Sequence, residues 1–167
     1  SLNSTIQASG EILKNITNAV QETVKDEEIK SETKNVLEKI NNELQNKIIS
    51  KLNFSLTNDQ RKTLEEINND LCSSTKMFRL LQGDVGSGKT IVSLLAAFNT
   101  INSGFQVAMM APTEILAKQH YSLAKNIFPN NINIELISGK STYNDKKEIL
   151  EKLSKHKINI IFGTHAI

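Results

Sequence analysis

The fold of this chain is decided by the stretch Arg79-Leu80-Leu81-Gln82-Gly83-Asp84-Val85-Gly86-Ser87-Gly88-Lys89-Thr90. From Gly83 to Thr90 it follows the pattern G-x-x-x-x-G-K-T, the phosphate-binding P-loop. An apolar run from Met77 to Leu81 precedes it and predicts a buried strand, and an Ala/Leu-rich run from Ile91 to Phe98 predicts a helix after it. Because the pattern needs this order of strand, loop and helix, we expect a P-loop rather than a plain glycine-rich turn.

The residue types of this loop suit a nucleotide triphosphate. Glycines let the backbone approach phosphate oxygens, and N–H groups at a helix N-terminus attract negative charge. Lysine reaches the β- and γ-phosphates, and the threonine hydroxyl binds Mg²⁺, so ATP and Mg²⁺ are the predicted cofactors. The predicted nucleotide-binding residues of the loop are Gly83, Asp84, Val85, Gly86, Ser87, Gly88, Lys89 and Thr90. Of these, Lys89 and Thr90 are the candidate catalytic residues, and Thr90 is the candidate magnesium ligand.

Composition sets the broad class of the chain. Its 167 residues suffice for one domain with an ordinary core, and the net charge of +2 does not by itself demand nucleic acid. Cys72 is the only cysteine, so no disulfide forms within the chain, and we expect a cytoplasmic protein. No apolar run approaches the length of a membrane span. The first residue is Ser1, from which we expect a processed chain or a piece of a longer one.

Residues 1–50 are predicted to form a helical segment or linker, separate from a domain at 51–167. Their apolar residues recur at spacings of mostly three, four or seven, which is typical of amphipathic helices. Ser9 and Asp26 are the expected N-caps of two such helices. The run Asp26-Glu27-Glu28 follows no buried strand, so it indicates an acidic first helical turn rather than a catalytic carboxylate box.

Strands and helices are expected to alternate over the rest of the chain. Thr57 or Asn58 is expected to cap a helix that runs to about Leu71, and Gln60 lies one turn into it. The further predicted elements are strands at 106–111, 132–137 and 158–162 and helices at 115–127, which has Pro112 in its first turn, and 143–153. This alternation predicts an α/β fold with a parallel sheet, with ligand-binding loops at the carboxyl ends of its strands.

Three of these stretches together resemble the RecG family of bacterial superfamily 2 DNA helicases. They are Met77 to Thr90, Met110 to His120 and Gly163 to Ala166, and the resemblance covers about Gln45 to Ile167. The transcription-repair coupling factor is the alternative, because it shares a similar P-loop and the Gln119-His120 pair. Ser87 and the run from Ala111 to Glu114 favour RecG. The resemblance implies a RecA-like P-loop NTPase fold and an ATP-dependent helicase that remodels branched DNA and stalled forks in recombination and repair.

The resemblance also implies roles for individual residues. Phe54 and Gln60 correspond to the motif that contacts adenine. The residues that correspond to the DNA-contacting motifs are Pro112, Thr113, Glu114, Ser138, Gly139, Gly163, Thr164 and His165. Helix N-termini and glycine turns offer N–H groups to a phosphate backbone without reading its sequence. Judged from the residues alone, an ordinary strand-to-helix turn is favoured over a DNA contact for each of these groups, by roughly three to one.

The sequence departs from the family in two respects. Residues 1–44 lack the pattern expected before the adenine-contacting motif. The sequence also contains no D-E-x-H box, whose acids hold Mg²⁺ in the family, and no second RecA-like domain. From this we expect an incomplete sheet and a chain that is inactive alone, with the remaining helicase segments supplied in trans. The alternative is a non-catalytic nucleotide-binding remnant.

Overall fold

The computed structural model describes residues 43–139 and 141–164. Residues 43–49 are helical, and Leu44 and Ile48 from this segment are buried in the main core. The helix predicted with Ser9 as N-cap and the first part of the helix predicted with Asp26 as N-cap lie outside the described residues. The division of the chain at residue 50 therefore stays a prediction.

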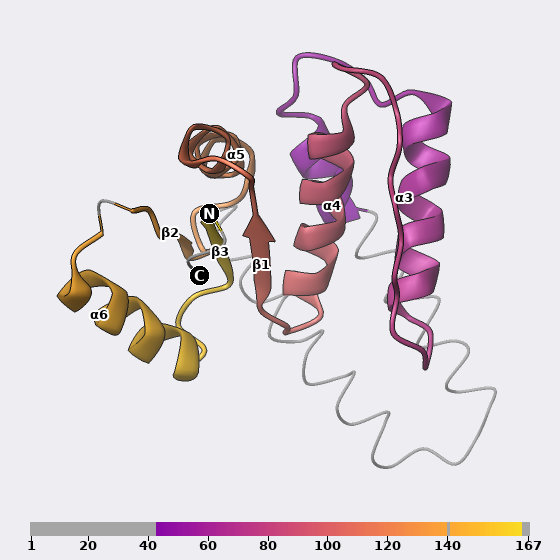
Figure 1. Ribbon diagram of the computed structural model, residues 1–167. Coiled ribbons are helices and arrows are strands. Elements are labelled where there is room, and N and C mark those ends of the chain that lie inside the picture. The colour runs from indigo at the N-terminus through magenta and orange to yellow at the C-terminus, as the bar shows by residue number, and fades with distance from the viewer. Residues whose placement is uncertain (1–42, 140, 165–167) are drawn as a thin grey trace, which may run out of the picture.

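A parallel sheet of three strands forms the centre of the α/β fold (Figure 1). β1 (Val107–Met110) and β2 (Ile134–Leu136) both pair with β3 (Ile160–Gly163), so the strand order is β1-β3-β2. In the register, Ile160 lies beside Val107 on one side and Ile134 on the other. The predicted parallel sheet is confirmed, and the strand that comes last in the sequence lies at its centre.

In the part of the chain that the structure describes, the sheet is accompanied by α3 (Asn58–Leu71), α4 (Lys89–Asn102), α5 (Glu114–Ile127) and α6 (Tyr143–Ser154), in addition to the helical residues 43–49. Side-chain caps explain where three of them begin. The hydroxyls of Thr57, Thr113 and Thr142 accept hydrogen bonds from backbone N–H groups in the first turns of α3, α5 and α6. The C-terminal end of α4 lies just before Gly104, whose φ of 86° is left-handed.

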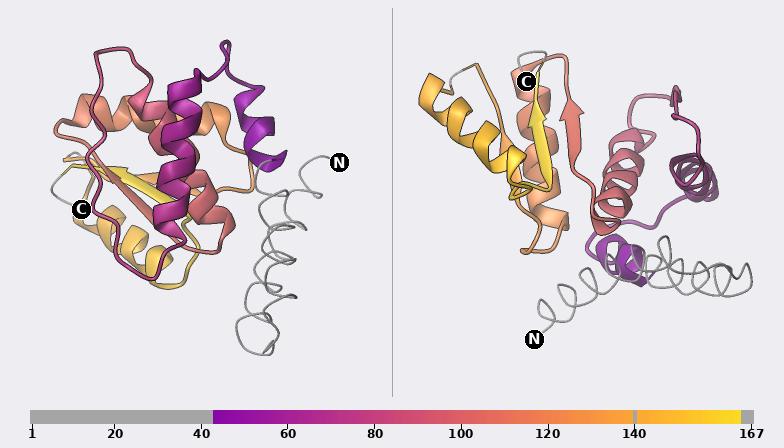
Figure 2. Two further views of the ribbon diagram at one scale, coloured as in Figure 1. Left: turned by 90° about the vertical axis from the view of Figure 1, so that its right-hand side faces the viewer. Right: turned by 90° about the horizontal axis from the view of Figure 1, so that it is seen from below.

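Side chains that alternate along β3 place a hydrophobic cluster on each face of the sheet. Ile160 and Phe162 belong to the larger cluster, with apolar residues of α3, α4 and α5, whereas Ile161 belongs to a smaller cluster with Ile149 of α6. Figure 2, in its right-hand view, accordingly shows α6 on one side of the strands and α3 and α4 on the other. The sheet is thus covered on both faces, as is usual for parallel strands.

Residues 77–81, predicted as a buried strand before the P-loop, do not form one. Met77 and Leu81 pack against the core, but Phe78 is 94% exposed and Leu80 is 80% exposed. The segment runs beside α3, on the far side of α4 from β1, where no described strand lies next to it (Figure 1). A strand needs a hydrogen-bonded neighbour as well as an apolar sequence, and this segment has no such neighbour among the described residues.

Pro112 precedes the N-cap Thr113 and therefore lies outside the first turn of α5, contrary to the prediction. Within the part of the chain that the structure describes, no helix is both long enough and apolar enough to cross a membrane.

Candidate functional site

The P-loop is a turn with two left-handed glycines that leads directly into α4. Gly86 has a φ of 82° and Gly88 a φ of 83°, and Gly88 is the N-cap of the helix. Side chains other than glycine strain this backbone region, so the glycines determine the shape of the loop. The N–H of Ser87 donates to the carbonyl of Asp84 at 3.2 Å, which closes the turn.

The side chain of Lys89 folds back into this loop. Its Nζ donates to the carbonyl oxygens of Gly83 and Asp84, each at 2.7 Å, and lies 3.4 Å from Oγ of Ser87. The cationic Nζ of Lys89 therefore lies within a glycine turn at the N-terminus of a helix. Both this positive charge and the helix dipole favour an anion at this position. The donor set fits the phosphates of a nucleotide, because Lys89 can exchange backbone carbonyls for phosphate oxygens.

Gln60 joins α3 to the P-loop. Its Oε1 accepts the N–H of Thr57 at 2.9 Å, and its own N–H donates to Oγ1 of Thr57 at 3.2 Å, which is a complete capping box. The other side of the same amide, Nε2, donates to the carbonyl of Ser87 at 2.8 Å. The structure thus brings together two of the predicted nucleotide-binding groups that lie far apart in the sequence.

Phe54, the other predicted adenine contact, lies in the segment between the helical residues 43–49 and α3, and half of its surface is exposed. Its role stays a prediction. Thr90 is the second residue of α4, beside the loop. No group of three or more His, Cys, Asp or Glu side chains with metal-binding geometry occurs among residues 43–139 and 141–164. Mg²⁺ commonly keeps several waters and binds through phosphates, so the single hydroxyl of Thr90 fits it as one protein ligand.

Arg79 attaches the segment before the P-loop to α3, a contact that the sequence analysis missed. Its guanidinium bonds Glu66 at 2.8 Å and Asp70 at 2.7 Å. The hydrogen bond to Asp70, and to a smaller extent the one to Glu66, raises the pKa of Arg79 above its ordinary value. Glu66 and Asp70 lie one helical turn apart, and this spacing is the only indication in the sequence that they share a cationic partner. The spacing does not indicate that the partner is Arg79.

The predicted DNA-contacting loops gather at one edge of the sheet. Two backbone bonds link them: the N–H of Ala111 donates to the carbonyl of Gly163, and the N–H of Ile137 donates to the carbonyl of Phe162, each at 2.8 Å. The residues of this edge, which we call the loop edge, are Ala111, Pro112, Thr113, Glu114, Ser138, Gly139, Gly163 and Thr164. His165, predicted with them, lies outside the described residues.

Within the loop edge, Glu114 contacts Gly139 directly. A carboxylate oxygen of Glu114 accepts the backbone N–H of Gly139. Both residues are predicted DNA contacts, but a hydrogen bond between them was not predicted. Their separation in the sequence carries no signal for the pairing, which follows from the order of the strands.

The comparisons with known proteins agree with this geometry. The family model of the DEAD/DEAH box helicases matches residues 57–167, which is most of the chain. This chain belongs to the DEAD/DEAH box helicase family. The matched region of this helicase chain begins at Thr57, the cap of α3, and includes both the P-loop and the loop edge.

Individual similar proteins indicate RecG as the type of helicase within this family that the chain resembles. The chain is 48% identical over 129 residues to the ATP-dependent DNA helicase RecG of Borreliella burgdorferi, covering 77% of this chain and 19% of that protein. It is 41% identical over 139 residues to RecG of Bacillus subtilis, covering 83% and 20%. A solved structure of RecG bound to a three-way DNA junction matches with a TM-score of 0.70 at 43% identity, over 75% of this chain and 17% of that one.

These matches confirm an incomplete RecA-like α/β fold and the resemblance to RecG. The chain spans about a fifth of the length of the curated relatives it matches. The matches favour RecG over the transcription-repair coupling factor, because the relatives at 41% to 48% identity described above are RecG proteins.

Proposed function

We propose that this chain is the nucleotide-binding part of a RecG-type ATP-dependent DNA helicase that acts on branched DNA and stalled forks in recombination and repair. The observation that carries the proposal is the loop in which Lys89 lies against two backbone carbonyls at the N-terminus of α4. The identity to RecG proteins supplies the type of helicase. For such a protein we propose a cytoplasmic location and helicase segments in trans as further partners.

In this proposal the residues of the loop hold ATP and Mg²⁺. Lys89 leaves the carbonyls of Gly83 and Asp84 and binds the β- and γ-phosphates, and Thr90 contributes its hydroxyl to Mg²⁺. The metal, when bound, neutralises charge that develops on the phosphate oxygens. Gln60 holds the loop through the carbonyl of Ser87, and Phe54 and Gln60 are the proposed contacts to adenine.

For DNA we propose contacts from the loop edge to the phosphate backbone. The residues are Pro112, Thr113, Glu114, Ser138, Gly139, Gly163, Thr164 and His165. The described ones lie on loops that follow three adjacent parallel strands, so a single extended strand of DNA can pass along them. Binding of this kind is independent of base sequence, because phosphates carry no sequence information.

The test is calorimetric titration of the full 167-residue chain with ATP and with ADP in the presence of Mg²⁺. Lys89→Ala is expected to remove most of the affinity, since it removes the cation that binds the phosphates, while the circular dichroism stays unchanged. Lys62→Ala, at an exposed lysine of α3, is the matched control and should bind as the wild type does. Equal binding by Lys89→Ala and the wild type would contradict the assignment of the loop.

A further inference from the structure

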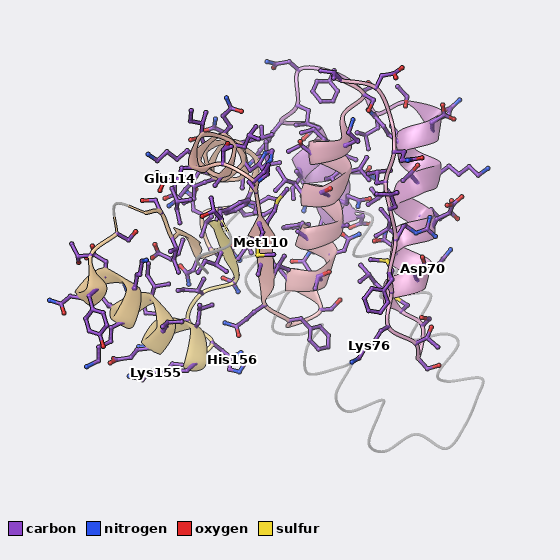
Figure 3. The ribbon with its side chains drawn as sticks, viewed as in Figure 1. Asp70, Lys76, Met110, Glu114, Lys155 and His156 are labelled. Atoms are coloured by element: carbon purple, nitrogen blue, oxygen red, sulfur yellow. The ribbon has the colours of Figure 1, made fainter. Side chains whose placement is uncertain are left out.

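The contact between Glu114 and Gly139 joins two loops that follow different strands. Glu114 is the first residue of α5, directly after the N-cap Thr113, and is partly buried. Its carboxylate accepts the N–H of Gly139 in the turn that follows β2. Figure 3 shows Glu114 at the start of α5, on the side where the chain leads from β2 to α6.

This contact crosses the end of the central strand. β1 and β2 lie on opposite sides of β3, and neighbouring strands are about 4.8 Å apart, so the two flanking strands are roughly 10 Å apart. Backbone bonds tie the end of β3 to Ala111 on one side and to Ile137 on the other. The Glu114 side chain closes the remaining gap between the outer two loops.

We infer that Glu114 is a positioning residue: its carboxylate holds the turn at Ser138 and Gly139 at a set distance from the N-terminus of α5. The inference rests on the proposed function, in which DNA passes along the loop edge. A fixed spacing between these two loops pre-organises the backbone groups that a DNA strand meets, which lowers the entropic cost of binding.

The chemistry favours this role for the side chain of Glu114 and leaves the proposed DNA contact of this residue to its backbone N–H group at the start of α5. A carboxylate and a phosphate are both acceptors, so the Glu114 side chain cannot donate to DNA, and their charges repel. As a tether, the same group is favourable twice, because it makes a charge-assisted hydrogen bond and lies in the first turn of a helix. Gly139 is part of the arrangement, since a Cβ at this position would collide with the Glu114 carboxylate.

Two substitutions separate the hydrogen bond from the charge. Both Glu114→Ala and Glu114→Gln remove the negative charge, but the glutamine keeps an oxygen that accepts the N–H of Gly139. Hydrogen exchange on the full chain without DNA is the first measurement. We expect the Gly139 amide to exchange faster in Glu114→Ala and to stay close to the wild type in Glu114→Gln. Unchanged exchange in Glu114→Ala would overturn the inference.

The second measurement is fluorescence anisotropy with a labelled oligothymidylate at low salt. Glu114→Ala is expected to bind about three- to tenfold more weakly than Glu114→Gln, the effect of about one lost hydrogen bond. Glu65→Gln, an exposed acid of α3, reports the general effect of one removed charge. Affinity of Glu114→Ala equal to or above that of Glu114→Gln would show that the carboxylate does not position the loop edge.

The two measurements also separate this inference from the proposed function. If no form of the chain, including the wild type, binds the oligonucleotide, the proposed DNA contacts are wrong. In that case hydrogen exchange still decides whether Glu114 holds the turn. If the wild type binds and exchange is unchanged in Glu114→Ala, the inference alone fails.

Discussion

Gly86 and Gly88 share a left-handed backbone, with φ of 82° and 83°, but they differ in their surroundings. A Cβ on Gly88 would collide with Nε2 of Gln60, whereas a Cβ on Gly86 would meet open space. The two positions therefore allow the strain of the backbone to be separated from the contact between α3 and the loop.

We predict that Gly88→Ala lowers the melting temperature and the ATP affinity more than Gly86→Ala does. Each substitution costs about 1–2 kcal/mol from the left-handed backbone, and only Gly88→Ala also displaces the Gln60 amide. Differential scanning fluorimetry and calorimetry measure the two effects. In a Gln60→Ala background the difference between the two glycine variants should shrink. Equal losses in the original background would show that the Gln60 contact does not matter.

His120 of α5 provides a prediction on pH. Burial lowers its pKa from the ordinary value of 6.5, so the folded state favours the neutral imidazole. Between the lowered pKa and 6.5 the unfolded chain binds more protons, and stability falls as the pH drops through this window. Above 6.5 the effect is absent. Urea unfolding of wild type and His120→Gln at several pH values tests this, and equal pH dependence in both would contradict it.

At the scale of elements, α6 begins with a complete capping box. Oγ1 of Thr142 accepts the N–H of Asp145 at 3.2 Å, and the carboxylate of Asp145 accepts the N–H of Thr142 at 2.8 Å. Two hydrogen bonds to the Asp145 carboxylate lower its pKa from 3.8. The larger effect comes from the side chain of Thr142 and the smaller one from the backbone N–H of Thr142. The ionised carboxylate therefore supports the fold above pH 3.8, and this support is lost as the pH falls below it.

We predict that Thr142→Ala lowers the free energy of unfolding by about 1 kcal/mol, the usual effect of a lost N-cap. The pKa of Asp145, followed by NMR titration, should rise toward 3.8, because the largest cause of its shift is removed. Thr142→Ser keeps the hydroxyl and should resemble the wild type in both measurements. An unchanged pKa in Thr142→Ala would mean that the side-chain bond is not formed in solution.

Most elements were predictable because their signals are local. The cap at Thr57 and the strand predicted at 132–137 each depend on a few neighbouring residues. The prediction of a strand at 77–81 was wrong, because a strand depends on a neighbouring strand that its own sequence does not encode. For the same reason the pairs Gln60 with Ser87 and Glu114 with Gly139 could not be predicted from spacing, although all four residues were predicted as site residues on other grounds.

At the scale of the whole molecule, the described surface exposes apolar side chains beside the P-loop. Phe78 and Leu80 point away from the core on a segment without a strand partner, and β1 lies at an edge of the sheet. Exposed apolar side chains and open strand edges both promote association. We therefore expect the purified chain to self-associate.

The prediction is that replacing Phe78 and Leu80 together by Ser reduces concentration-dependent association, measured by static light scattering, without loss of circular dichroism. Both side chains lie outside the core clusters, so the fold should tolerate the change. Phe105→Ser is the control, since Phe105 is also exposed but follows the turn after α4. An equal effect of Phe105→Ser would point to general surface hydrophobicity instead of this segment.

The position of β3 has a consequence for the synthesis of the protein. β1 and β2 are translated first, but they do not pair with each other, and among the described strands each pairs with β3 alone. The sheet therefore cannot close while the ribosome is still making the residues before Ile160. Pairing between distant segments is slow to form, so the nascent chain carries β1 unpaired during the translation of α5, and both β1 and β2 unpaired during the translation of α6. A pause in translation just before β3 would prolong the stage at which this chain needs a chaperone most.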